Sequence, residues 1–199
     1  MKLFRVIFAI ASSCLSVSLA QATPVTFTAT LSGPAESPAN ASPGTGFATM
    51  VFDTALHTLS INVVFSGLTG TTTASHIHCC TATPGVSTAG VATETPTFRG
   101  FPLGVSSGSY SNIFDLTLTS SFNAAFITAN GGTAASAELA LFNGSVAGRS
   151  YLNVHSSVFA GGEIRGFLQP SAVPVPNSLL LLGLGLASLA SLRKYRRVH

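Results

Sequence analysis

Charged side chains are scarce in this chain. Among its 199 residues there are nine Lys or Arg and six Asp or Glu, together 8% of the total. Six of the basic residues lie before residue 23 or after residue 192, whereas all six acidic residues lie between residues 23 and 170. The central part holds only three Arg and therefore has a formal charge of −3. The net charge of the whole chain, +3, comes from the basic residues at its two ends. It therefore gives no support to a nucleic-acid partner, and we expect none.

Motifs of the common secreted enzymes are also lacking. The sequence contains no nucleophile elbow, no phosphate-binding loop and no suitably spaced pair of carboxylates. It has no internal repeat. We therefore expect a non-enzymatic protein.

The first 22 residues have the three parts of a secretory signal peptide. Lys2 and Arg5 give a positively charged start, an apolar run follows, and Ala20-Gln21-Ala22 forms a small-x-small cleavage site. We expect cleavage after Ala22 and export of the remaining chain.

Residues 171–199 contain a proline motif, an apolar segment and a basic cluster, in that order. Pro176 to Leu192 spans 17 residues, the lower limit for a helix that crosses a bilayer. We therefore predict a C-terminal hydrophobic helix, with the basic cluster on the cytoplasmic side.

This tail resembles the PEP-CTERM sorting signal of Gram-negative bacteria, with Val175 where that motif has a Glu. The resemblance implies processing by an exosortase-type membrane enzyme and a transient, membrane-anchored precursor in the inner membrane. It implies delivery to the cell surface or the extracellular space. A permanent single-pass anchor is the alternative. The residues that carry the resemblance are Pro174, Pro176, Arg193, Arg196 and Arg197.

Residues 23–170 are numerous enough for one domain with a hydrophobic core. Only residues 121–130 have helical spacing, followed by Gly131-Gly132 as a stop. Short strands separated by turns predict an all-β protein, an antiparallel sandwich or barrel with one short helix. The segments with strand patterns are 25–31, 46–53, 56–65, 75–78, 109–119, 136–142, 149–156 and 163–168.

Several stretches of this domain, in their order and spacing, resemble the CHRD domain of chordin and of secreted bacterial proteins. The resemblance covers residues 25–168. It implies an immunoglobulin-like β-sandwich in an extracytoplasmic protein, with no established enzyme activity for the bacterial members. The stretches are TATLSGPAESPANASPGTGFATMVFD, LSINVVFSGLTG, ASHIH and YLNVHSSVFAGGEIRGFL.

The stretch SHIHCC, residues 75–80, concentrates residues with metal and redox chemistry. On a strand, His76 and His78 point to one face with Cα atoms about 6.6 Å apart, and His155 lies on a second predicted strand. Three neutral imidazoles would suit copper or zinc. Two alternatives stay open: histidines that only pack and donate to backbone carbonyls, and a redox enzyme that uses the same residues.

Cys79 and Cys80 are the two cysteines left after export, because Cys14 lies in the signal peptide. Free thiols tend not to persist in an oxidising compartment. A vicinal disulfide, pairing between chains and ligation of a soft metal are the alternatives to two buried thiols.

The stretch GGEIRG, residues 161–166, predicts a turn followed by a strand. Glu163 and Arg165 are two residues apart, so we expect them to share a face and form an exposed ion pair. Gly166 is expected at a bulge.

These features predict an exported protein of the cell surface or of an extracellular, biofilm-type matrix. We expect contacts with extracellular polysaccharide or with surface proteins. A copper- or zinc-binding extracytoplasmic module is the alternative function.

Overall fold

A computed structural model describes residues 23–171 of the chain. The predicted signal peptide, the sorting residues and the predicted C-terminal helix lie outside this range. Within it, no helix has both the length and the apolar character needed to cross a bilayer.

The domain is built on one antiparallel sheet of eight strands. Their order across the sheet is β4-β6-β7-β1-β2-β3-β5, with the short β8 also paired to β1. The all-β, antiparallel prediction is confirmed. The strands are β1 (Val25–Ser32), β2 (Thr45–Asp53), β3 (Thr58–Ser66), β4 (Thr72–His78), β5 (Gly108–Asp115), β6 (Tyr151–Ser156), β7 (Ile164–Phe167) and β8 (Gln169–Pro170).

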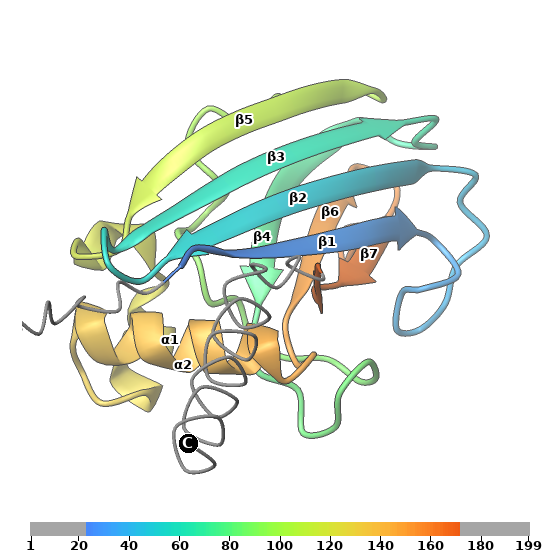
Figure 1. The fold of residues 1–199 in the computed structure, drawn as a ribbon. Coiled ribbons are helices and arrows are strands. Elements are labelled where there is room, and N and C mark those ends of the chain that lie inside the picture. The colour runs from blue at the N-terminus through green and yellow to red at the C-terminus, as the bar shows by residue number, and fades with distance from the viewer. Residues whose placement is uncertain (1–22, 172–199) are drawn as a thin grey trace, which may run out of the picture.

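The sheet curls back on itself and gives a sandwich-like arrangement. β1, β2, β3 and β5 form one layer, and β4, β6 and β7 lie behind it (Figure 1). The two layers meet where β1 and β7 share a single residue pair, Ser32 with Arg165. Buried side chains of both layers belong to one core, among them Phe27 and Phe52 from the first layer and Ile77 from the second. Each such burial contributes about 1.5 to 3 kcal/mol.

Two helices lie at one end of the sheet (Figure 1). α1 (Ala124–Ala129) begins at Asn123, whose side chain accepts a hydrogen bond from the Ala125 amide at 2.9 Å. Its end is followed by Gly131 and Gly132, both with positive φ, so the helix predicted near residues 121–130 is confirmed. A 3₁₀ turn, η1 (Thr119–Ser121), precedes it.

The strand predicted over residues 136–142 is wrong, because these residues form part of α2 (Ala134–Val146). The domain therefore has a second, longer helix. Ala, Glu and Leu are strong helix formers, and Thr133 and Ser136 form a capping box at the start of α2. The helix buries Ala137, Leu141 and Gly144, which are spaced three or four residues apart.

The predictions for GGEIRG are wrong in two respects. Glu163 and Arg165 are 0% and 4% exposed, and loops distant in sequence provide their partners. The Glu163 carboxylate accepts hydrogen bonds from Ser42 Oγ and the Thr69 amide, both at 2.5 Å. Arg165 Nε donates to the Ala35 carbonyl at 2.5 Å.

Gly166 is not at a bulge, because the register between β6 and β7 runs unbroken through it. A side chain at this position would collide with the carbonyl of Thr30 on β1. Glycine therefore allows the backbones of β7 and β1 to approach closely.

Candidate metal centre

The register of β4 and β6 brings the three predicted histidines to one face of the second layer. His76 lies opposite Asn153, and His78 lies opposite Tyr151. Residues directly opposite in an antiparallel pair share a face, and so do residues two apart on one strand. His155, two residues after Asn153, therefore joins the pair on β4.

The imidazole rings of these residues form a compact cluster. One ring nitrogen of each histidine lies within 4.8 Å of the other two. His76 Nδ1 and His155 Nε2 are 3.4 Å apart. The ring centroid of His78 is 5.9 Å from the ring centroid of His76 and 5.9 Å from that of His155. The structure thus brings together all three histidines that the sequence singled out.

Backbone carbonyls determine which nitrogen of each ring carries the proton. A carbonyl oxygen only accepts, so the nitrogen that contacts it must donate. In the neutral ring the other nitrogen then holds a lone pair, which leaves His76 Nδ1, His78 Nε2 and His155 Nε2 as acceptors. The donating contacts are His76 Nε2 to Pro96 at 2.7 Å, His78 Nδ1 to Ala89 at 2.9 Å and His155 Nδ1 to Ala160 at 2.9 Å.

None of the three lone pairs meets a protein donor in the part of the chain that the structure describes. His78 Nε2 is buried and has no hydrogen-bond partner within residues 23–171. The 3.4 Å contact between His76 and His155 joins two acceptors in the assigned tautomers, so it does not satisfy either ring. Buried polar atoms are normally paired, and metal-ligating histidines usually donate their second nitrogen to a carbonyl or carboxylate. The arrangement has the chemistry of a cation site.

Protonation does not readily supply the missing donor. Burial lowers the pKa of all three imidazoles, against the opposing effect of the carbonyl contacts. For His78 the pKa falls to about 4. The rings are therefore neutral near pH 7, the form in which imidazole binds a metal.

Tyr151 belongs to the centre, although its role was not predicted. Its ring stacks on His78 with centroids 4.8 Å apart and an interplanar angle of 7°. Its hydroxyl accepts from the Ala89 amide at 3.2 Å and donates to the Ala89 carbonyl at 3.3 Å, the same carbonyl that orients His78. The sequence does contain a sign of this role: Tyr151 lies four residues before His155, so on a strand both side chains point to the same face.

The cysteine pair lies apart from the histidine cluster. Cys79 and Cys80 are joined in a vicinal disulfide, and Cys79 belongs to the hydrophobic core. Both sulfurs face Gly144 of α2 so closely that no side chain fits there. Among the described residues, the metal-ligand group with His76 and His78 includes His155 and neither cysteine.

Comparison with known protein families gives two matches. Residues 27–168 match the CHRD domain, and residues 172–197 match the PEP-CTERM protein-sorting motif. No curated protein and no solved structure matches the chain. The sorting motif implies processing by exosortase, an integral membrane enzyme, and hence an exported, membrane-anchored precursor in a Gram-negative bacterium.

Proposed function

The chain belongs to the CHRD domain family, and we propose that it is an exported surface protein that binds one copper or zinc ion through His76, His78 and His155. The convergence of three imidazole lone pairs without a protein donor carries this proposal. Each lone pair is oriented by a carbonyl on the opposite side of its ring.

The spacing of the rings suits a tetrahedral ion. Metal-to-nitrogen distances of about 2.0 to 2.1 Å place two ligands of a tetrahedron about 3.4 Å apart. His76 Nδ1 and His155 Nε2 already have this separation, 3.4 Å. The widest separation in the group is within 4.8 Å, so binding would draw the rings together. Three protein ligands would leave one position for water or a small ligand.

The donor set favours copper or zinc over harder cations. Calcium and magnesium prefer oxygen ligands, and the cluster contributes imidazole nitrogens only. Neutral imidazole suits both copper and zinc. Stacking on Tyr151 limits rotation of the His78 ring, which keeps its lone pair directed at the centre.

Calorimetric titration of copper and zinc into the metal-free protein tests this assignment. Wild type is expected to bind one equivalent, and His76→Ala/His78→Ala is expected to bind none. Replacement of His155 alone should weaken binding strongly, because it removes one of the three protein ligands.

Two further variants serve as controls for that titration. His57→Ala removes a histidine that pairs with Glu138 outside the cluster and should bind metal like wild type. Cys79→Ser/Cys80→Ser should also bind, because the sulfurs lie against α2. Unchanged binding in the His76/His78 variant would refute the site, and lost binding in the cysteine variant would make the thiols ligands.

We also propose that the protein acts as a structural component of the surface or matrix rather than as an enzyme. The sorting motif supports delivery to the surface, and the sequence lacks the common secreted-enzyme motifs. Extracellular polysaccharide is the partner that we favour. Fractionation of the host should recover the protein with the matrix polysaccharide. Metal-dependent turnover of a substrate, or recovery only as free protein in the medium, would contradict this role.

A further inference from the structure

The middle of the outward side of the first layer is an uncharged surface, which we call the outer face. It consists of the outward residues in the middle of β1, β2, β3 and β5, which the strand register aligns in three rows of four. None of these residues is buried by the described part of the chain. The rows are Thr30, Phe47, Val64 and Ser109; Thr28, Thr49, Asn62 and Ser111; and Thr26, Val51, Ser60 and Ile113. The next row, toward the β2–β3 turn, holds Asp53 and Asp115 and lies outside this surface.

The composition of the outer face differs from that of an ordinary solvated sheet. Such faces usually carry Lys, Glu and other charges that prevent association. Here seven residues have hydroxyl groups, one has an amide, four are apolar and none is charged. The face therefore suits a partner that is itself uncharged and rich in hydroxyl groups.

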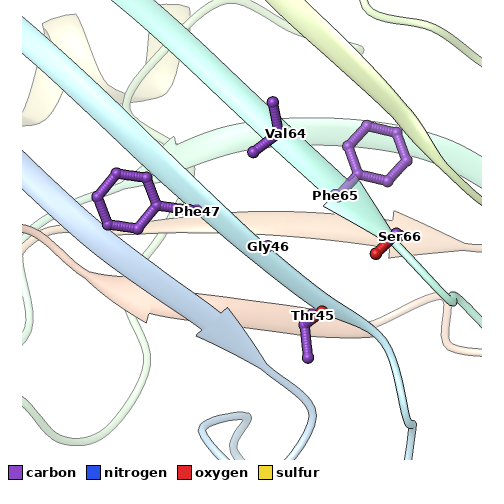
Figure 2. A pocket seen from close by; sticks show the side chains of 6 residues that line it. All are labelled: Thr45, Gly46, Phe47, Val64, Phe65 and Ser66. Atoms are coloured by element: carbon purple, nitrogen blue, oxygen red, sulfur yellow. The ribbon is translucent and has the colours of Figure 1, made fainter.

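Phe47 and Val64 form the apolar centre of one side of this face. They lie opposite each other on β2 and β3 and are 46% and 56% exposed. Figure 2 shows them on neighbouring strands beside Gly46, where they line an open depression of about 360 Å³. A second depression, of about 300 Å³, shares both residues and continues over Asn62 and Ser111.

We infer that the outer face binds a neutral polysaccharide chain. A sugar ring has an apolar C–H face, which can stack on the exposed ring of Phe47, and hydroxyl groups at its rim. The Ser, Thr and Asn side chains around Phe47 can both donate to and accept from those hydroxyls. Sugar and face thus match in both apolar and polar groups. The inference rests on the proposed matrix role and names the surface that performs it.

The charge of the domain selects a neutral polymer over an acidic one. Residues 23–170 have a formal charge of −3, and no cation lies on the outer face. Of the three arginines, Arg165 is buried, Arg99 pairs with Glu94 and Arg149 donates to the Thr81 carbonyl. A polyuronate would therefore be repelled, whereas a neutral glycan would not.

Affinity electrophoresis of the exported protein, purified from its host, tests the inference. Gels contain galactomannan, xyloglucan or hydroxyethyl cellulose as neutral probes, and alginate as the acidic one. Wild type is expected to be retarded by at least one neutral polymer and not by alginate. Phe47→Ala/Asn62→Ala should lose at least tenfold in affinity. Phe47→Trp should retain binding, because a larger aromatic ring still stacks.

Matched controls separate this result from a general loss of folding or of the metal centre. Leu56→Ala removes a side chain that is 66% exposed in the β2–β3 turn, away from the three rows, and should bind like wild type. His76→Ala/His78→Ala should also retain glycan binding, since these residues lie on the other layer.

Three results would overturn the inference. The first is no retardation of wild type by any neutral probe, and the second is equal retardation of wild type and Phe47→Ala/Asn62→Ala. The third is a dimer in solution that the double replacement dissociates without any effect on glycan binding, which would make a second copy of the chain the occupant. Recovery of the protein with the matrix despite such a result would leave the matrix role standing and reject only this surface.

Discussion

At the scale of single residues, Glu36 is a buried ionisable group that lies beside Arg165 of β7. Its Oε1 and Asn153 Oδ1 are both buried without a hydrogen-bond partner in the described structure. They lie 2.8 and 2.6 Å from the point where a side chain on Gly162 would begin. Burial raises the Glu36 pKa to about 7, against the attraction of Arg165. In its protonated form Glu36 carries no charge, so its burial costs less.

Glu36→Gln should change the pH dependence of stability. Between the ordinary pKa of 4.5 and about 7, folded wild type holds a proton that the unfolded chain has lost. Its free energy of unfolding therefore falls as the pH rises through this window, by up to about 3 kcal/mol. The glutamine cannot ionise, so the variant should gain stability relative to wild type from pH 4.5 to pH 7.

Urea unfolding of metal-free wild type and variant at pH 4.5, 6 and 8 measures this difference. Glu94→Gln, which removes a carboxylate from the ion pair with Arg99, is the control and should show no comparable gain. If the difference between Glu36→Gln and wild type is the same at all three pH values, the protonation of Glu36 is not linked to folding.

The histidine cluster could be predicted from the sequence, but its tautomers could not. A strand has a period of two residues, so His76 and His78 had to share a face, and the neighbouring strand supplied His155. The carbonyls that orient the rings belong to Ala89, Pro96 and Ala160. These lie in loops, whose course depends on the tertiary structure and has no periodic pattern. The partners of Glu163 were missed for the same reason.

At the scale of elements, α2 holds the disulfide in place. Its Gly144 faces the sulfurs of Cys79 and Cys80, and a methyl group there would collide with both. The contact links the helix to the segment that follows β4. His78 ends that strand directly before the disulfide, so the packing of the disulfide on α2 helps to hold it in place. On its other side, Tyr151 packs on the His78 ring.

Gly144→Ala should therefore destabilise the domain. Alanine favours a helix over glycine by about 1 kcal/mol, but the collision with the disulfide should outweigh this gain and lower the free energy of unfolding by about 1 to 3 kcal/mol. Urea unfolding measures the change. Gly161→Ala is the matched control, because a methyl group at that position meets no atom within 4 Å. A Gly144→Ala protein more stable than wild type would contradict the packing of α2 on the disulfide.

The strand pattern was a weaker guide where helix-forming residues coincide with apolar alternation. Residues 136–142 read as a strand, yet Ala, Glu and Leu favour a helix and Thr133 provides the cap. Residues 116–119 likewise fall outside β5, because the Asp115 side chain accepts from the Thr117 amide at 2.9 Å and turns the chain. In both segments, local hydrogen bonds to side chains determine the backbone conformation, and the period-two pattern does not.

At the scale of the whole molecule, the domain presents two different faces. The second layer holds the histidine cluster under loops, and the first layer exposes the uncharged outer face. In β1, β2, β3 and β5 the more buried residues alternate with the more exposed ones, as the period-two pattern of a strand requires. The curl between β7 and β1 depends on one residue pair and on the close approach at Gly166, and no periodic signal indicates either.

The ends of the chain give a prediction at this scale. The mature protein should begin near Thr23 and should lack the hydrophobic tail, because the sorting motif at residues 172–197 implies cleavage by exosortase. Intact-mass analysis of the protein from its natural host measures both ends. A mature species that still carries residues 179–199 would contradict processing and indicate a permanent anchor.

The most direct test of the metal centre is elemental analysis of the exported protein, purified from its host without chelators. We expect about one equivalent of copper or zinc per chain in wild type and in His57→Ala, and less than about a tenth of an equivalent in His76→Ala/His78→Ala/His155→Ala. Circular dichroism should show that the triple variant keeps the β-sheet. A wild-type protein without transition metal that also takes up none on reconstitution, or a folded triple variant with a full equivalent, would contradict the metal centre.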